Sequence, residues 1–134
     1  MDRCFFDTNI LLYLLSEDEA KADRAEAAIS EGGTISAQVL NEFASVASRK
    51  LAMSWAEIRD VLTPIRALCK VEPVSVDTHQ RGLEIAERYG FSIYDALIVA
   101  SAQLADCTVL LSEDLHDGQM FEGRLSVRNP FVSK

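Results

Sequence analysis

The alternation of short apolar runs with longer helical stretches most constrains how this chain can fold. The run Arg3–Phe6 predicts a buried first strand. Further strands are expected at residues 34–35, 71–76, 108–111 and 125–127. Strands that alternate with helices predict a mainly parallel sheet, and right-handed crossovers place helices on both of its faces. We therefore expect a three-layer α/β/α fold with a mainly parallel central sheet, formed by a single domain over residues 1–134.

Capping residues and glycines mark the expected helix boundaries. Helices are expected at residues 9–15, 19–31, 36–50, 54–69, 77–89 and 92–105. Ser54 with Glu57 has the spacing of a capping box. Asp77 with Gln80 has the same spacing, and Gly90 is positioned to end the helix that follows.

The composition fits a domain with its own hydrophobic core. Of the 134 residues, 49% are hydrophobic, and a chain of this size buries about two thirds of its unfolded surface. The three cysteines have no metal-ligand spacing and sit in or beside apolar runs, so we expect buried thiols in a reducing compartment: Cys4, Cys69 and Cys107. The apolar run at 5–15 is interrupted by Asp7 and Asn9 and is not followed by a small-residue cleavage site, and no stretch approaches ~20 apolar residues. We expect a cytoplasmic protein with no membrane partner.

Four acidic residues from distant parts of the chain are expected at one edge of the sheet. Asp7 directly follows the first strand, and Asp114 lies just beyond the strand at 108–111. Asp95 lies in the first turn of its helix, and Glu42 lies about two turns into the helix after the second strand. Strand ends and the starts of the following helices share one edge of a parallel sheet, so these carboxylates can meet there.

Carboxylates brought together in this way repel one another. Two unit charges ~4 Å apart cost about 4 kcal/mol at an effective dielectric near 20, so the cluster must protonate, pair with bases or bind cations. No Lys or Arg lies within three residues of any of the four acids, although basic partners could come from elsewhere. Oxygen ligands suit Mg²⁺ or Mn²⁺, which can polarise a phosphodiester and activate water. The pattern predicts phosphodiester hydrolysis.

Each acid also has an ordinary structural interpretation. Asp95 could be the partner of Ser92 in a helix cap, and Asp7 could be a turn or capping residue. Glu42 could be a solvated helix residue, and Asp114 could belong to a polar surface turn. Their joint placement at one edge is what favours a functional site.

Short motifs surround these acids in a characteristic order. They read FFDTNIL at 5–11, SAQVLNEF at 36–43, YDALIVA at 94–100 and LLSEDL at 110–115, with NPF at 129–131 near the end. With these motifs the chain resembles the PIN-domain family, and specifically the VapC-type toxins of bacterial toxin–antitoxin pairs. The resemblance covers essentially the whole chain.

The resemblance implies a PIN-like fold, a Mg²⁺- or Mn²⁺-dependent endoribonuclease, an RNA substrate, a cognate antitoxin and a homodimer. It implies catalytic and metal-binding roles for Asp7, Glu42, Asp95 and Asp114. It also implies supporting polar roles for Thr8, Asn9 and Ser112. The last motif departs from the family pattern, because Glu113, Asp114 and Asp117 compete for the fourth acidic position. We choose Asp114 from its place after Ser112 and keep Asp117 as the alternative.

The net charge of −8 argues against a protein that grips RNA through a basic face. Four of the negative charges belong to the expected site, and metal ions would supply a local positive field for phosphate. Arg49, Lys50 and Arg88 are candidate RNA contacts, but the sequence does not gather them into a patch. An antitoxin could inhibit the site by inserting an Arg or Lys among the carboxylates.

Other functions stay open at this stage. A phosphotransfer domain of haloacid-dehalogenase type would use Asp7 as its nucleophile with a second acid two residues later, but that position is Asn9. A receiver domain would carry paired acids on its first strand, and Asp7 has no acidic neighbour. A catalytically inactive PIN-like module that binds RNA or protein is the alternative from a different class.

Three further residues could have a functional role but also have simpler interpretations. His116 could act as a general base, but a metal-activated water needs no imidazole, and His79 has no partner at ligand spacing. Trp55 begins an apolar helix face with Ile58, Leu62 and Ile65. We expect that face in the core, with part of it available for a dimer surface.

Overall fold

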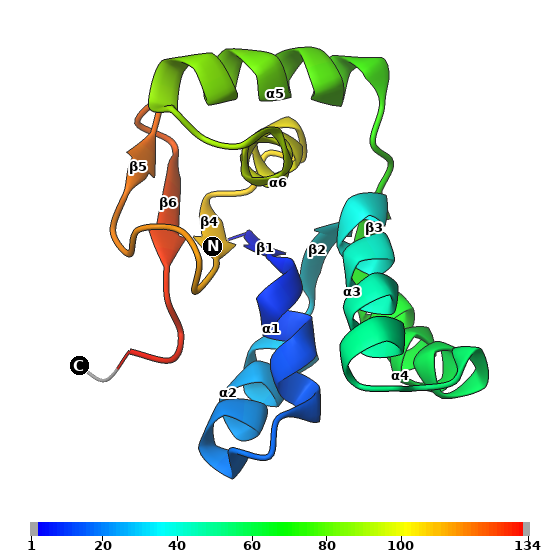
Figure 1. The fold of residues 1–134 in the computed structure, drawn as a ribbon. Coiled ribbons are helices and arrows are strands. Elements are labelled where there is room, and N and C mark those ends of the chain that lie inside the picture. Colours follow the sequence, from blue (N-terminus) through cyan, green and yellow to red (C-terminus); the bar gives the residue numbers. More distant parts are fainter. Residues whose placement is uncertain (1–2, 133–134) are drawn as a thin grey trace.

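The computed structural model describes residues 3–132, and its strands form one six-stranded sheet in the order β3-β2-β1-β4-β6-β5 (Figure 1). The strands are β1 Cys4–Phe6, β2 Gly33–Ser36, β3 Cys69–Glu72, β4 Val109–Leu111, β5 Met120–Phe121 and β6 Leu125–Arg128. All neighbouring strands pair in parallel except β5, which runs antiparallel to β6 at one edge. The mainly parallel sheet expected from the sequence is confirmed.

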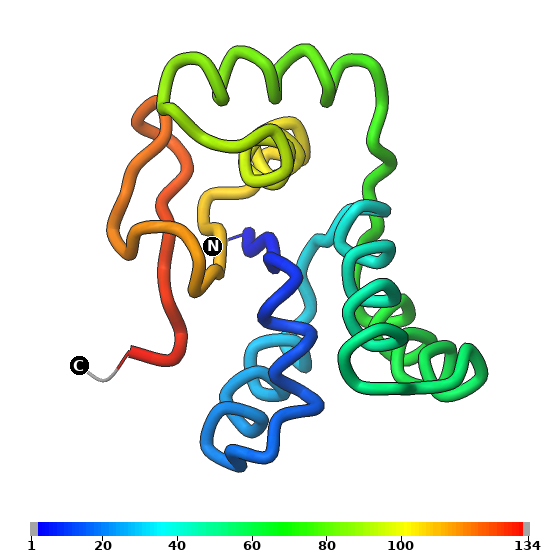
Figure 2. Tube along the Cα trace, in the orientation of Figure 1, coloured from blue at the N-terminus to red at the C-terminus, as the bar shows by residue number. Residues whose placement is uncertain are grey.

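Helices cover both sides of this sheet, as expected (Figures 1 and 2). They are α1 Thr8–Leu12, the 3₁₀ turn η1 Tyr13–Leu15, α2 Glu19–Ser30, α3 Ala37–Lys50, α4 Trp55–Leu68, α5 Val76–Tyr89 and α6 Ile93–Leu104. Helices α5 and α6 lie on one side, with α6 beneath α5, and α1 to α4 lie on the other (Figure 1). Because it is packed between α5 and the sheet, α6 is apolar on almost every face.

The central strands are buried on both faces, which explains their continuous apolar sequence. Phe5 and Phe6 of β1 and Leu110 of β4 are fully buried. Cys69 and Cys107 are buried free thiols, as expected, whereas Cys4 is half-buried. No helix within the described residues is both long and apolar enough to cross a membrane.

Several local predictions were wrong. The third strand begins at Cys69 and ends at Glu72, earlier than residues 71–76. Helix α5 begins at Val76 behind a capping box of Ser75 and Thr78, not of Asp77 and Gln80. The Ser75 Oγ accepts from the Thr78 N–H while the Thr78 Oγ1 accepts from the Ser75 N–H, so two terminal donors are satisfied two residues earlier than predicted.

Two further differences concern the surface. The short strand β5 was not predicted, because a two-residue strand carries no periodicity. Trp55 was expected in the core and is 62% exposed, whereas Ile58 and Ile65 on the same helix are buried. The capping box of Ser54 and Glu57 and the left-handed Gly90 at the end of α5 are confirmed.

Gly33 permits a close approach between β2 and β1, and we predict that Gly33→Ala is destabilising. A Cβ at this position would lie 2.7 Å from the Phe6 Cε2 and 2.9 Å from the Cys4 carbonyl oxygen. Because the Phe6 ring is fully buried and the carbonyl belongs to the backbone, neither can move freely. Urea unfolding should give a loss of about 2 kcal/mol. Combining Gly33→Ala with Phe6→Leu should cost less than the sum of the two single changes; strict additivity would contradict this explanation.

Candidate active site

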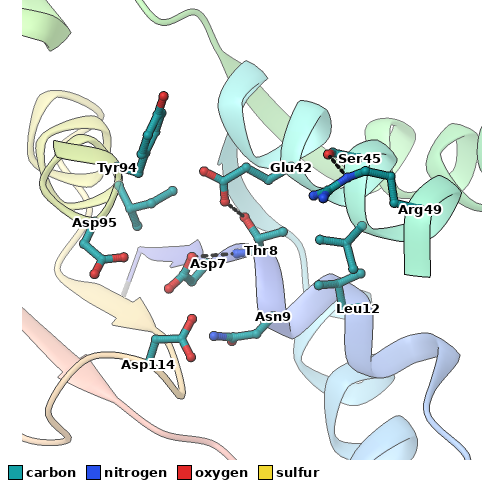
Figure 3. Close-up of a pocket in the computed structure, with 12 residues that line it drawn as sticks. Asp7, Thr8, Asn9, Leu12, Glu42, Ser45, Arg49, Tyr94, Asp95 and Asp114 are labelled. Atoms are coloured by element: carbon teal, nitrogen blue, oxygen red, sulfur yellow. Dashed lines mark hydrogen bonds between the residues drawn. The ribbon is translucent and has the colours of Figure 1, made fainter. Parts of the chain in front are cut away.

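The four acids predicted from the sequence line one pocket of about 320 Å³ at the carboxyl edge of the sheet (Figure 3). Asp7 follows β1, Glu42 lies on α3, Asp95 lies in the first turn of α6, and Asp114 follows β4. The other residues lining the pocket are Thr8, Asn9, Leu12, Ser45, Val46, Arg49, Tyr94 and Ile98. The structure therefore brings together all four acids from separate parts of the chain.

Asp7 is the most buried of these acids, with 5% of its surface exposed. Its backbone N–H donates to the Leu111 carbonyl at 3.0 Å, which extends the pairing of β1 with β4 by one residue. Its Oδ1 accepts from the Thr8 N–H at 2.7 Å and caps α1. Its Oδ2 accepts from the Ser112 hydroxyl at 2.7 Å. Both carboxylate oxygens are thus held, one by the next residue in the sequence and the other by a hydroxyl that follows β4.

Ser112 connects Asp7 to the turn that carries Asp114. Its side chain is fully buried, and while its hydroxyl donates to Asp7, its Oγ accepts from the Asp114 N–H at 3.2 Å and the Leu115 N–H at 3.3 Å. One hydroxyl therefore fixes both the carboxylate of Asp7 and the backbone position of Asp114.

Glu42 is held by two neutral side chains. Its Oε2 accepts from the Thr8 hydroxyl at 2.8 Å, and its Oε1 accepts from the Gln38 Nε2 at 2.7 Å. The same Gln38 nitrogen lies 3.2 Å from the Tyr94 carbonyl, so it also ties α3 to the start of α6. Sequence reasoning missed Gln38. Its spacing of four residues before Glu42, which places both on one helix face, was the available signal.

Burial and neighbouring negative charge raise the pKa values of two of these acids, Asp7 and Asp95. Burial raises the pKa of Asp7 to about 6, and the charges of Asp114 and Glu42 add to this effect against the hydrogen bonds from Ser112 and Thr8. The pKa of Asp95 is also raised, first by burial and then by the charges of Asp114 and Glu42. The acids are therefore close enough to interact electrostatically, and the site favours positive charge or protons.

Arg49 is the one cation among the described residues that line the pocket. It is exposed, and its Nε donates to the Ser45 Oγ at 3.0 Å (Figure 3). None of the ion pairs within residues 3–132 involves Arg49. Of the other candidate RNA contacts, Lys50 does not line the pocket, and Arg88 pairs with Glu122 at 3.3 Å. Arg49 is thus the basic group available to an anion in the pocket.

The remaining acids of the last motif point elsewhere. The Asp117 Oδ1 accepts from the Asn129 N–H at 2.8 Å, and Asp117 does not line the pocket. The Glu113 carboxylate accepts from the Tyr13 hydroxyl. Of the three competing residues, Asp114 is the one at the pocket. His116 is exposed and lies outside the pocket lining.

The chemistry of the donor set fits a hard divalent cation. All four acidic groups offer oxygen ligands, and the raised pKa of Asp7 reflects a carboxylate whose charge is poorly compensated. Within residues 3–132, however, no three His, Cys, Asp or Glu side chains are packed closely enough to form a ready-made metal cluster. Direct ligation would need these side chains to draw together, whereas Mg²⁺ commonly retains several waters and binds through one or two carboxylates.

Asn9 adds a buried donor beside the acids. Its Oδ1 accepts from the Glu113 N–H at 3.4 Å, while its Nδ2 is buried with no hydrogen-bond partner among the described residues. In Figure 3 the Asn9 amide extends toward Asp114. An unpaired buried N–H is costly, so this donor is suited to a carboxylate or phosphate oxygen in the pocket.

The sequence of this α/β domain matches the model of a known protein family. The sequence model of the PIN domain matches residues 4–116. The chain belongs to the PIN-domain family. No curated protein sequence gives a significant match.

Solved structures of toxin–antitoxin systems share this fold. A toxin–antitoxin complex from Klebsiella pneumoniae is similar with a TM-score of 0.72 and 23% identity, over 96% of this chain and 98% of that one. VapC20 of Mycobacterium tuberculosis, a toxin that cleaves the sarcin-ricin loop, gives 0.67 and 20%, over 83% and 91%. VapBC2 from Rickettsia felis, solved with a promoter DNA fragment, gives 0.67 and 18%, over 94% and 97%. At these identities the likeness establishes the fold.

We predict that Asp7→Asn stabilises the metal-free protein above about pH 6. A carboxyl whose pKa rises from 3.8 unfolded to about 6 folded stabilises the fold fully below pH 3.8, and this contribution is lost as the pH rises through 6. The ionised Asp7 then costs the folded state about 3 kcal/mol relative to its protonated form.

Urea unfolding in chelator across this pH range tests the prediction. The variant should exceed the wild type at about pH 8 by up to about 3 kcal/mol, and this advantage should shrink toward about pH 4. Glu26→Gln, a change of an exposed acid on α2, serves as the control for loss of one negative charge. An Asp7→Asn effect that does not vary with pH would show that burial does not govern this carboxyl.

Proposed function

We propose that this protein is a metal-dependent endoribonuclease that hydrolyses RNA phosphodiester bonds at the pocket formed by Asp7, Glu42, Asp95 and Asp114. The observation that carries the proposal is the convergence of these four carboxylates, from four separate elements, on one pocket. Membership of the PIN-domain family supports the nuclease assignment. The similar fold of VapC20, a toxin that cleaves the sarcin-ricin loop, supports RNA as the substrate class.

In this proposal Asp7, Glu42, Asp95 and Asp114 hold Mg²⁺ or Mn²⁺. Such an ion supplies Lewis-acid polarisation of the phosphodiester. The protein's own polar groups position the acids: Ser112 and the Thr8 N–H hold Asp7, and the Thr8 hydroxyl and Gln38 hold Glu42.

Two further groups are proposed to contact the substrate phosphate. Arg49 offers an exposed guanidinium that forms no ion pair within residues 3–132, and Asn9 offers its buried amide donor. Both are donors in a pocket that also contains four acids, so they can bind phosphate oxygens that the carboxylates would repel.

We further propose that the protein is the toxin of a toxin–antitoxin pair. In this proposal two copies form a homodimer, and a cognate antitoxin binds and inhibits it. Solved toxin–antitoxin complexes of the same fold support this proposal. An acidic pocket with raised carboxyl pKa values is a suitable receptor for an inhibitory Arg or Lys. An inhibitory complex with no basic side chain near Asp7 or Asp95 would contradict that mode of inhibition.

Cleavage of total cellular RNA by the purified, antitoxin-free protein tests the enzymatic proposal. Discrete cuts should appear with Mg²⁺ or Mn²⁺, disappear with chelator, and disappear in Asp7→Asn and Asp114→Asn because each removes a carboxylate from the pocket. Losses of about 100-fold or more are expected for such groups. Asp117→Asn should cut like the wild type, because Asp117 faces the Asn129 backbone instead of the pocket.

The outcomes separate the competing functions. Loss of cleavage in Asp117→Asn with retention in Asp114→Asn would reassign the fourth acid. A folded protein that binds Mn²⁺ but cuts no RNA would favour an inactive PIN-like binding module. Incorporation of phosphate at Asp7 would instead favour the phosphotransfer alternative.

We also predict that Mn²⁺ raises the thermal stability of the wild-type protein near neutral pH. An ion that binds only the folded state stabilises it by about 2.7 kcal/mol at a concentration 100 times its Kd, and here it also relieves repulsion among the acids. Calorimetric melting should show the upward shift in the wild type and in Glu26→Gln. The shift should be largely absent in Asp7→Asn; an equal shift in that variant would place the ion elsewhere.

A further inference from the structure

A second pocket of about 510 Å³ adjoins the active-site pocket and shares Glu42, Ser45 and Tyr94 with it. Its remaining lining comes from α3 and from the loop after β3: Ala37, Gln38, Asn41 and Val74. The inference below rests on the proposed function, because it concerns the RNA cleaved at the neighbouring acids.

Tyr94 stands at the junction of the two pockets with its side chain largely free. The residue is 66% exposed, and no contact between aromatic rings within residues 3–132 involves it. Its backbone is fixed in the first turn of α6, where its carbonyl accepts from Gln38. In Figure 3 its ring rises beside Glu42 while the next residue, Asp95, turns its carboxylate toward Asp7. Tyr94 therefore presents an aromatic surface from a rigid position beside the acids.

The chemistry of the second pocket favours a neutral planar group over an anion. Glu42 is its one charged residue among those described, so it repels phosphate. Val74, which is 41% exposed, and Ala37 add apolar surface. The exposed amide of Asn41 can hydrogen-bond the edge of a heterocycle, whereas Gln38 is already engaged with Glu42.

We propose that the second pocket is a nucleobase subsite, in which one unpaired base of the substrate RNA stacks on Tyr94 while the adjoining phosphate reaches the acidic pocket. Shared walls place the two pockets as close neighbours, as a base and phosphate of one strand require. Base–aromatic stacking tolerates any base, so Tyr94 supplies affinity and position. Asn41 is the residue able to discriminate among base edges.

The test measures binding of a fluorescent, short single-stranded RNA of mixed sequence to the Asp7→Asn variant, which leaves the RNA uncut. Adding Tyr94→Ala should raise the Kd about 10-fold, the size of effect seen when one stacking partner is removed. Tyr94→Phe should bind like the parent because it keeps the ring. Tyr94→Leu should bind as weakly as Tyr94→Ala because it keeps only apolar bulk. Trp55→Ala, which removes a similarly exposed aromatic that lines neither pocket, should have no effect.

A second readout uses protein with Asp7 intact. Tyr94→Ala should raise KM for RNA cleavage with a smaller change in kcat, and the Mn²⁺-dependent shift in melting temperature should persist because the carboxylates remain. RNA labelled with 2-aminopurine should lose fluorescence on binding through stacking, and should not do so with Tyr94→Ala.

The failures of the two proposals are distinguishable. If Asp7→Asn abolishes cleavage but Tyr94→Ala changes neither Kd, KM nor 2-aminopurine emission, the nuclease stands and the subsite is wrong. A peptide segment of a partner protein is then the remaining occupant. If Tyr94→Leu binds as well as Tyr94→Phe, apolar contact alone suffices and stacking is excluded. If the protein neither binds nor cuts RNA, the proposed function fails and the subsite fails with it.

Discussion

The parallel pairing of β1 with β4 is the constraint on which the site depends. In its register Phe6 lies opposite Leu111, so the next residues along the two strands, Asp7 and Ser112, leave the sheet together. A hydroxyl and a carboxylate that are 105 residues apart in sequence thereby form a buried hydrogen bond of 2.7 Å. A charged carboxylate this deeply buried would be strongly disfavoured without hydrogen-bond donors. The positions of the donors are set by the buried apolar strands that precede them.

The residue after Asp7 also holds Glu42, which lies 34 residues further along the chain. Thr8, the residue after Asp7, donates its backbone N–H to Asp7 and its hydroxyl to Glu42. Gln38 then joins Glu42 to the first turn of α6, which carries Asp95. A chain of neutral donors thus runs from β4 through β1 and α3 to α6. The donors hold the carboxylates near one another without cancelling their charge, so the metal-free site retains a repulsion that a cation would relieve.

The sequence was sufficient to place the acids because topology decides their location. In a parallel sheet a residue just after a strand must lie at the carboxyl edge, and Asp7 and Asp114 satisfy that condition whatever the details of packing. The choice of Asp114 over Asp117 was made only from the place of Asp114 after Ser112. Which of the two lines the pocket depends on a turn in which the Ser112 Oγ accepts from the Asp114 N–H and the Asn129 N–H donates to Asp117. Gln38 was missed for a similar reason: a glutamine on a helix is informative only when its neighbours in space are known. Trp55 was misplaced because helical periodicity shows which residues share a face but not where that face ends.

The net negative charge of the chain limits how the two pockets could bind RNA. A net charge of −8 argues against RNA binding through a broad basic surface, so under the proposed function recognition depends on a few local contacts. The described residues provide groups of three kinds: carboxylates that can recruit cations, one arginine in the lining of the acidic pocket, and an exposed aromatic ring beside a pocket with a single charged residue. The first two address a phosphate and the third addresses a base.

Under the proposed function, a strand would be held where one phosphate and one unstacked base are presented together. An exposed loop offers this arrangement, whereas a regular duplex keeps its bases stacked within the helix. The selectivity of such a site would therefore come more from the shape of the RNA than from its sequence.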